Sequence, residues 1–189
     1  MINISRLVDW EFIAELEGGC ATIGYVPPPD GGKVESGVTI ATGFDLGQRS
    51  ATDIKALPDY LIVKLTPFLG LTGNKAIYKL KECPLVLTKT EALQIDNLSH
   101  REALVNLLKD WAAADTSIDY RYLDKNLRTV IASVAFQYGD LPSRTPKFWS
   151  QVTSNQWVDA YYNLLDFKDN FRTRRHKEAA KVRGVIYGD

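Results

Sequence analysis

The first helix-like pattern in the chain covers residues 4–17. Apolar residues recur there at every fourth position: Ile4, Val8, Phe12 and Leu16. This spacing places them on one face of an α-helix. Gly18 and Gly19 follow at once, and glycine readily takes the left-handed conformation that ends helices. The pattern therefore predicts a helix whose last turn contains Glu17.

Residues 20–48 lose the helical spacing. Three consecutive prolines, Pro27 to Pro29, and the glycines after them are incompatible with a helix. The short run at 38–42, Val-Thr-Ile-Ala-Thr, is rich in the β-branched residues that strands favour. We expect a small antiparallel sheet or irregular hairpin here, a β-lobe of about residues 18–48 beside a helical body.

From residue 50 onward, signals for helix starts dominate. Ser50 with Asp53, and Thr88 with Glu91, have the three-residue spacing of a capping box. The helix after Thr88 has a long apolar pattern. These signals predict a helical lobe over residues 50–189.

The segment at 123–138 is apolar over most of its circumference. A helix that is apolar nearly all round is buried in the middle of a domain. Gly139 is its expected C-terminal cap, Ser154 is expected to cap a later helix, and a final basic helix is expected to end at Gly184. With no repeat and no linker, we predict one domain over residues 1–189, of the α+β class and mainly α.

Charge and composition exclude several classes of protein. The 189 residues are 45% hydrophobic with a formal net charge of +0, and the sequence pI is about 6.7. Nucleic-acid-binding proteins normally carry a basic excess, so we expect no nucleic-acid partner. No apolar run approaches the roughly 20 residues that cross a bilayer. The N-terminus does not have the pattern of a signal peptide. We therefore expect synthesis in the cytoplasm, and export by other machinery.

The cysteines and histidines give no metal motif. Cys20 and Cys83 lack a C-x-x-C spacing, and we interpret them as small buried hydrophobic residues. A disulfide between them remains open for an oxidising compartment. His100 and His176 have no second ligand nearby in the sequence. We expect no metal site and no cofactor.

Two carboxylates suggest a glycosidase mechanism. Glycoside hydrolysis uses one carboxyl group that holds its proton and one that has lost it. At the C-terminus of an apolar helix, Glu17 would have its charged form disfavoured by the helix dipole and by desolvation. Asp45 lies in a Gly-containing turn that water can reach, which favours its ionised form. On this interpretation Glu17 is the general acid and Asp45 is the base or electrostatic partner.

Each of these residues also has an ordinary structural interpretation. A glutamate in the last turn of a helix is commonly a solvated side chain. An aspartate such as Asp45 is commonly a turn residue. Position alone does not separate the two interpretations, although Glu15 is expected to point away from Glu17 because i and i+2 do not share a helix face.

A family resemblance favours the catalytic interpretation. The Glu-Gly pair that ends the first helix, followed by SGVTIATGFDLGQ at 36–48, resembles the phage-type lysozyme family. Within that family, the lysozyme domain of the bacteriocin pesticin and related phage endolysins are most similar. LRTVIASVAFQYG at 127–139 is similar to the central buried helix of phage lysozymes. QWVDAYYNLLDF at 156–167, with the Arg-rich helix after it, is similar to their C-terminal helices. The resemblance thus implies a lysozyme-like fold.

The resemblance assigns roles to particular residues. It implies that Glu17 is the proton donor and that Asp45 is the second carboxylate. It implies that Thr39 faces the anomeric carbon and helps to position the attacking water, a role that a hydroxyl can fill. Gln137 would line the floor of the cleft and bind the sugar chain.

Other residues compete for two of these roles. Thr22, in a Thr-Ile-Gly string, resembles the threonine after the hairpin turn of many phage lysozymes. Asp30 and Glu35 are alternatives for the second carboxylate. We favour Thr39 and Asp45 because the longer string around them matches as a block. In the commoner phage lysozymes the aspartate precedes the threonine, whereas here it follows.

The family also pairs an arginine from its late helices with the catalytic glutamate. Arg172, Arg174 and Arg175 are the candidates here, and we name Arg175 as the residue that positions the acid. An adjacent guanidinium would lower the pKa of Glu17 and oppose the dipole and desolvation effects. The alternative is that these arginines form a solvated basic face.

Four aromatic residues could stack on sugar rings, although most aromatic residues must fill the core. They are Tyr25, Phe44, Tyr138 and Trp149. Tyr25 and Phe44 belong to the β-lobe and are the ones we assign to substrate binding.

The resemblance implies a lysozyme-type glycoside hydrolase, a muramidase that cleaves the β-1,4 bond between N-acetylmuramic acid and N-acetylglucosamine and so causes cell lysis. By analogy we expect an inverting route, which needs carboxyl groups roughly 6.5–9.5 Å apart. The alternatives are a lytic transglycosylase, or a module that binds peptidoglycan or an inhibitor without cleavage. We expect a monomer that acts on peptidoglycan strands in the periplasm or at the wall. It would arrive there through a holin, as an endolysin, or as an antibacterial effector with an immunity protein.

Overall fold

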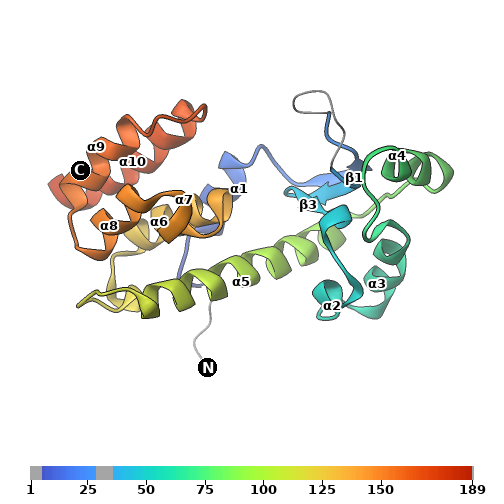
Figure 1. The fold of residues 1–189 in the computed structure, drawn as a ribbon, viewed down its shortest axis with the longest axis horizontal. Coiled ribbons are helices and arrows are strands. Elements are labelled where there is room, and N and C mark those ends of the chain that lie inside the picture. The colour runs from blue at the N-terminus through green and yellow to red at the C-terminus, as the bar shows by residue number, and fades with distance from the viewer. Residues whose placement is uncertain (1–5, 29–35, 189) are drawn as a thin grey trace. The chain divides into compact units, whose positions relative to one another are not determined.

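A computed structural model describes residues 6–28 and 36–188 of the chain. The chain forms two compact units. We call residues 17–99 the sheet unit, and residues 1–16 together with 100–189 the helical unit. Figure 1 shows that the sheet unit holds the sheet and its short helices, and that the helical unit consists of helices. The fold is mainly α with a small sheet, as predicted.

The sheet has three antiparallel strands in the order β1-β2-β3. They are β1 (Ala21–Tyr25), β2 (Thr39–Ala41) and β3 (Phe44–Asp45). Ile40 pairs with Phe44, and both side chains are buried in the core of the sheet unit. Thr39 precedes Ile40 in β2, and Asp45 follows Phe44 in β3. The side chains of Thr39 and Asp45 therefore point to the opposite face of the sheet, because neighbouring residues along a strand alternate between its faces.

Short helices cover the core face of this sheet. They are η2 (Leu46–Gln48), α2 (Ala51–Ile54), α3 (Asp59–Leu65), η3 (Thr66–Phe68) and α4 (Gly73–Glu82). The predicted capping box at Ser50 is confirmed, since its backbone N–H donates to Asp53 Oδ2 at 2.7 Å. Apolar side chains of these helices pack with those of β2 and β3. The sheet unit therefore includes these helices as well as the sheet, and it runs as far as Ser99.

The long helix α5 (Lys89–Ala113) contributes its first part to the sheet unit and its second part to the helical unit. Its predicted capping box is confirmed. The backbone N–H of Thr88 donates to Glu91 Oε2 at 2.7 Å, and the backbone N–H of Glu91 donates to Thr88 Oγ1 at 3.2 Å.

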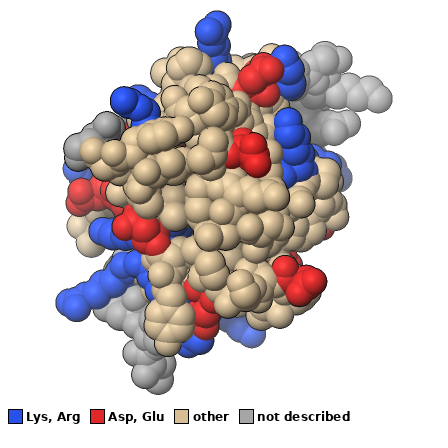
Figure 2. Space-filling model, turned by 90° about the vertical axis from the view of Figure 1, so that its left-hand side faces the viewer, with Lys and Arg blue, Asp and Glu red and all other residues tan. Residues whose placement is uncertain are grey.

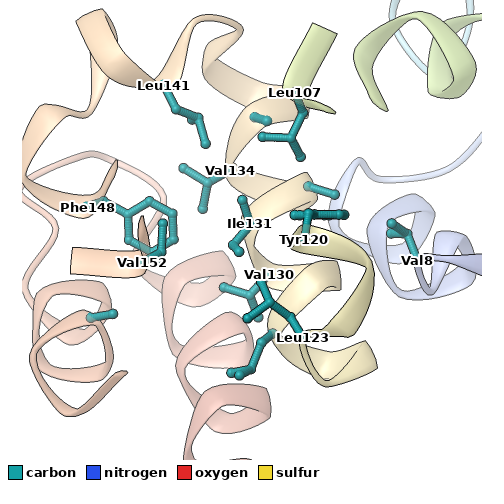
Figure 3. Packing of buried hydrophobic residues seen from close by; sticks show 14 of the residues in the cluster. Val8, Leu107, Tyr120, Leu123, Val130, Ile131, Val134, Leu141, Phe148 and Val152 are labelled. Carbon is teal, nitrogen blue, oxygen red and sulfur yellow. The ribbon is translucent and has the colours of Figure 1, made fainter. Parts of the chain in front are cut away.

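The predicted central helix is α6 (Lys125–Tyr138), and it is confirmed. All seven residues from Thr129 to Ala135 are buried. Around it lie α1 (Trp10–Leu16), η4 (Tyr120–Tyr122), α7 (Leu141–Arg144), α8 (Pro146–Thr153), α9 (Trp157–Leu165) and α10 (Arg172–Tyr187). Figure 3 shows Val130, Ile131 and Val134 of α6 among side chains from several of these elements. Gly139 ends the helix with φ 76°, as predicted.

Three helix boundaries differ from the predictions. The first helix begins at Trp10, because Asp9 Oδ1 accepts the Phe12 N–H at 3.2 Å; Ile4 lies outside the described residues. Ser154 caps the end of α8, not the start of a helix, since left-handed Asn155 (φ 58°) turns the chain before α9. The last helix runs through Gly184 to Tyr187, because Ile186 still packs on the core.

The surface carries both signs of charge. Figure 2 views one face of the molecule, on which basic and acidic side chains are scattered between uncharged residues. Within the described residues, no helix is both long and apolar enough to cross a membrane.

Candidate active site

Glu17 follows directly after α1, which ends at Leu16. Gly18 and Gly19 come next and have φ angles of 81° and 104°. Side chains other than glycine rarely adopt this left-handed region, so the two glycines let the chain leave the helix and enter β1. Glu17 is half-buried. Glu17 thus lies one residue beyond the helix whose last turn was predicted to contain it, and directly before the two glycines. Its role as the acid stays a prediction.

A pocket of about 530 Å³ lies in the sheet unit, and Glu17 forms part of its wall. Residues 17–21 form one part of the wall, and the β2–β3 turn at 41–43 forms another. Tyr25 completes it, with its side chain exposed. The volume is within the range of roughly 300–1,000 Å³ that is usual for ligand pockets.

Tyr25, Thr39 and Asp45 form one row across the sheet. Tyr25 is the register partner of Thr39, and Thr39 is the register partner of Asp45. Residues directly opposite each other on antiparallel strands project from the same face. The row therefore shares the face of Tyr25, which also lines the pocket beside Glu17. Thr39 and Asp45 are not themselves part of the wall of that pocket.

The Asp45 side chain is held by two backbone amides. Its Oδ1 accepts the N–H of Gly37 at 3.0 Å and the N–H of Gly47 at 2.8 Å. These bonds fix the carboxyl group at the start of η2. Both of these bonds are to Oδ1, so the two amides hold one of the two carboxyl oxygens.

Thr39 is buried, with 3% of its surface exposed. Its hydroxyl donates to the carbonyl oxygen of Gly37 over 3.5 Å, which is a long hydrogen bond. The same Gly37 donates its N–H to Asp45. Thr39 and Asp45 are therefore linked through Gly37 as well as through strand pairing.

Phe44 does not offer a face to a sugar ring. Its side chain is 3% exposed and belongs to the core of the sheet unit. The guanidinium of Arg49 lies 4.6 Å above the ring centre. Phe44 alternates with Asp45 along β3, so the strand that presents Asp45 must bury Phe44. Of the two aromatic residues assigned to substrate binding, only Tyr25 lies in the pocket wall.

The competing residues are placed as follows. Thr22 lies in β1, and its carbonyl oxygen accepts the N–H of Leu87 at 2.8 Å. Asp30 and Glu35 lie outside the described residues. The assignment of Asp45 as the second carboxylate, in preference to Asp30 and Glu35, therefore stays a prediction.

Gln137 and Arg175 meet in the helical unit. Arg175 Nη2 donates to Gln137 Oε1, and Arg175 Nε donates to Asp169 Oδ2 at 2.8 Å. Arg175 Nη1 also pairs with Glu178 Oε2. Burial lowers the pKa of Arg175, but Glu178 and Asp169 outweigh this effect and raise it above its ordinary value. The guanidinium is thereby surrounded by partners of its own unit.

The neighbouring arginines differ in burial. Arg174 donates to Glu178 Oε1 at 3.2 Å and to the Ser133 carbonyl oxygen at 2.9 Å. Arg172 is exposed at the first position of α10. Residues 172–175 therefore do not form one solvated basic face. Arg174 and Arg175 are buried, and the carboxylates of Glu178 and Asp169 balance their charges. The roles of Gln137 in substrate binding and of Arg175 in positioning the acid remain predictions.

Comparison with protein families identifies the relationship. The matching family is described as pesticin, a bacterial toxin homologue of phage lysozyme, C-terminal part, and the match covers residues 7–158. This is most of the chain. The chain belongs to the pesticin family. The match includes the whole sheet unit and α6, but it ends before α10 and Arg175. A comparison with curated proteins finds no match.

Membership of the pesticin family supports a lysozyme-like peptidoglycan hydrolase, with peptidoglycan as the substrate class. It agrees with the resemblance drawn from 36–48 and 127–139. In this pesticin-family chain, Glu17, Tyr25, Thr39 and Asp45 all lie in the sheet unit. Gln137 and Arg175 lie in the helical unit.

One polar cluster of this pesticin-family chain was missed by sequence reasoning. Asp96 of α5 is buried and contacts Thr42 of the pocket wall. The available signal was a carboxyl residue directly after Ile95, within the apolar pattern of a long helix. Polar residues in such a position usually have a specific partner.

The cysteines are free and differ from the prediction. Cys83 is exposed, because it caps the end of α4 rather than filling a core position. Cys20 is half-buried in the pocket wall. Within residues 6–28 and 36–188, no group of three His, Cys, Asp or Glu side chains could hold a metal ion.

Proposed function

We propose that the chain is a muramidase that hydrolyses the β-1,4 bond between N-acetylmuramic acid and N-acetylglucosamine in peptidoglycan. The observation that carries this proposal is the position of Glu17 in the wall of a ligand-sized pocket. It is supported by the family, which is homologous to phage lysozyme. Cleavage of this bond in the wall would lyse the cell.

Glu17 is the proton donor in this proposal. A general acid must reach the glycosidic oxygen, and a half-buried carboxyl group in a pocket wall can do so. The two glycines after Glu17 add no side chain to the pocket wall beside it. Tyr25 supplies an aromatic surface in the same wall on which a sugar ring can stack.

Asp45 and Thr39 activate and position the attacking water. The amides of Gly37 and Gly47 hold Oδ1 of Asp45, and we assign the other oxygen, Oδ2, to the water. Thr39 is opposite Asp45 on the next strand, and its hydroxyl can donate to the water or accept from it. We propose an inverting reaction, in which water attacks from the face opposite to the leaving group.

The test compares Glu17→Gln with Glu15→Gln on purified peptidoglycan. Glu15 is an exposed residue of α1, two positions away, so its variant is a matched control. Loss of the general acid should lower turnover by roughly 10²–10⁴-fold. We expect both variants to fold, as judged by circular dichroism, and only Glu17→Gln to lose clearing of a cell-wall suspension.

Mass spectrometry of the products separates the alternatives. Reducing N-acetylmuramic acid ends support hydrolysis, whereas 1,6-anhydro ends together with an active Asp45→Ala variant would indicate a lytic transglycosylase. Binding to peptidoglycan without release of reducing ends would indicate a non-catalytic module. Clearing by Glu17→Gln at the rate of the wild type would refute the role of Glu17.

The substrate lies outside the cytoplasmic membrane, so the proposed activity requires delivery to the periplasm or the wall. We propose release through a holin or transfer as an antibacterial effector. The neighbouring genes distinguish the two routes. A holin gene supports an endolysin, and a gene for a small periplasmic inhibitor supports an effector with an immunity partner.

A further inference from the structure

Asp96 holds the turn between β2 and β3 with both of its carboxyl oxygens. Oδ1 accepts the backbone N–H of Thr42 at 2.8 Å, and Oδ2 accepts the Thr42 hydroxyl at 2.8 Å. The two residues are 54 positions apart in the chain. Asp96 is 5% exposed and Thr42 is 8% exposed. A buried pair of hydrogen bonds from one side chain to one residue fixes both the position and the orientation of that residue.

The turn that Asp96 holds is part of the pocket wall. Residues 41–43 line the pocket that contains Glu17. Ala41 has a φ of 53°, in the left-handed region that non-glycine residues rarely adopt. Such a conformation is strained and persists only where the surroundings impose it. Thr42, the residue after Ala41, donates two hydrogen bonds to Asp96, and these bonds can hold Ala41 in this conformation.

The same carboxyl group reaches the other part of the pocket wall. Cys20, three residues after Glu17, interacts with Asp96 and with Thr42. Burial, together with the hydrogen bond to Asp96, raises the pKa of the Cys20 thiol to about 11. The thiol therefore stays protonated near neutral pH and can donate to Asp96. Ala21, the next residue, is the register partner of Ala41.

We propose that Asp96 is a positioning residue, which fixes the β2–β3 turn against the segment that follows Glu17 and so sets the shape of the pocket. This inference rests on the proposed function. Asp96 is not part of the pocket wall, so it acts on substrate only through Thr42 and Cys20. Displacing a catalytic group by about 1 Å can lower turnover by roughly 10²-fold.

The test measures kcat and KM for Asp96→Ala, Asp96→Asn and Thr42→Val on soluble peptidoglycan fragments. Asp96→Asn keeps one acceptor oxygen, and Thr42→Val removes only the hydroxyl donor. Glu91→Ala is the matched control. Glu91 also belongs to α5 and is buried, and its oxygens accept the Thr88 N–H at 2.7 Å and Lys64 Nζ at 2.6 Å. It lies outside the pocket wall.

All rates are compared at the same interval below the melting temperature of each variant. We expect kcat/KM to fall at least tenfold in Asp96→Ala and to fall less in Thr42→Val. Thr42→Ser, which keeps the hydroxyl, should recover most of the loss seen in Thr42→Val. Glu91→Ala should lose thermal stability but keep its kcat/KM within twofold of the wild type.

A second measurement separates positioning from catalysis. In an inactive Glu17→Gln background, Asp96→Asn should weaken the binding of an N-acetylglucosamine oligomer at least fivefold by calorimetry, and Glu91→Ala should not. An active wild type with Asp96 variants that behave like Glu91→Ala would overturn the positioning role alone. A wild type that does not cleave peptidoglycan would overturn the proposed function and this inference with it.

Discussion

Gly37 and Gly47 lie backbone against backbone beside Asp45. A Cβ atom on Gly37 would lie 2.4 Å from the Cα of Gly47 and 2.6 Å from Asp45 Oδ1. No side chain fits into this space. The contact brings both amides within reach of the one carboxyl oxygen that they hold. The geometry of the predicted second carboxylate thus depends on two residues that have no side chains.

Replacing Gly37 by alanine should therefore disturb the site directly. The added methyl group forces apart two backbones, and overpacking of this kind typically costs about 1–3 kcal/mol. We expect urea unfolding to show this loss, together with a fall in hydrolysis of at least tenfold. Gly184→Ala is the control. It lies inside α10 with no atom near its Cβ position, and it should be neutral or gain up to about 1 kcal/mol.

Glu178 should be critical for the stability of the helical unit. It is fully buried and contacts Arg174, Arg175 and Ser133, whose hydroxyl donates to Oε1 at 2.5 Å. Removing one partner from a buried ion pair leaves the other charge uncompensated, which typically costs about 3–5 kcal/mol. We expect Glu178→Gln to lose this much in denaturant unfolding. Glu82→Gln, in an exposed pair with Lys79, should lose less than about 1 kcal/mol.

The two cysteines should differ in reactivity. The thiolate is the nucleophile in alkylation, and the pKa of Cys20 is about 11. At pH 8 only about one Cys20 in a thousand is therefore a thiolate. Cys83 is exposed. We expect iodoacetamide to label Cys83 at least tenfold faster, as followed by peptide mass spectrometry. Equal rates in the Cys20→Ser and Cys83→Ser variants would contradict the burial of Cys20 against Asp96.

Asp169 should contribute stability that depends on pH. Burial raises the pKa of Asp169, but hydrogen bonds from Tyr138 and Arg175 outweigh it and hold the pKa below its ordinary value of 3.8. A carboxyl group whose pKa is depressed in the folded state stabilises the fold above its unfolded pKa. This contribution is lost as the pH falls through the folded value. The wild type should therefore exceed Asp169→Asn in unfolding free energy by a constant amount from pH 6 to 8.

The difference between the two proteins should shrink below pH 4. Urea unfolding at a series of pH values measures it. Asp166→Asn is the control, because its ion pair with Lys168 is exposed on both sides and should contribute little at any pH. A difference for Asp169→Asn that grows as the pH falls would show that the sign is wrong.

Local signals predicted much of the fold. The capping boxes at Ser50 and Thr88, the end of α6 at Gly139 and the glycine pair after Glu17 depend on neighbouring residues, and all are observed. The start of α1 was predicted wrongly, because the apolar spacing was followed past the local cap that Asp9 Oδ1 forms with the Phe12 N–H. The N–H of Asp9 also donates to Thr129 Oγ1 at 3.0 Å, and no pattern within residues 4–17 reveals this partner 120 positions away.

In the candidate site, too, residues in local strings could be predicted, whereas residues with distant partners could not. Glu17, Thr39 and Asp45 stand in local strings that resemble a family, so their positions could be predicted. Asp96 and Glu178 act through residues 54 and 45 positions away, and pairing over such separations is decided by tertiary packing. Phe44 was assigned to the substrate because aromatic residues suit both sugar rings and cores, and only burial separates the two.

The helical unit draws on both ends of the chain, whereas the sheet unit is made of consecutive residues. Leu7, Val8 and Ile13 are buried in a cluster whose remaining members begin at Leu104. During translation, the segment that carries the first helix must therefore wait for its partners, while every partner that the sheet unit needs has left the ribosome once Ser99 has emerged. A nascent chain stopped near that point would expose Val8 and Ile13, and chaperones that recognise apolar segments would be expected to bind there first.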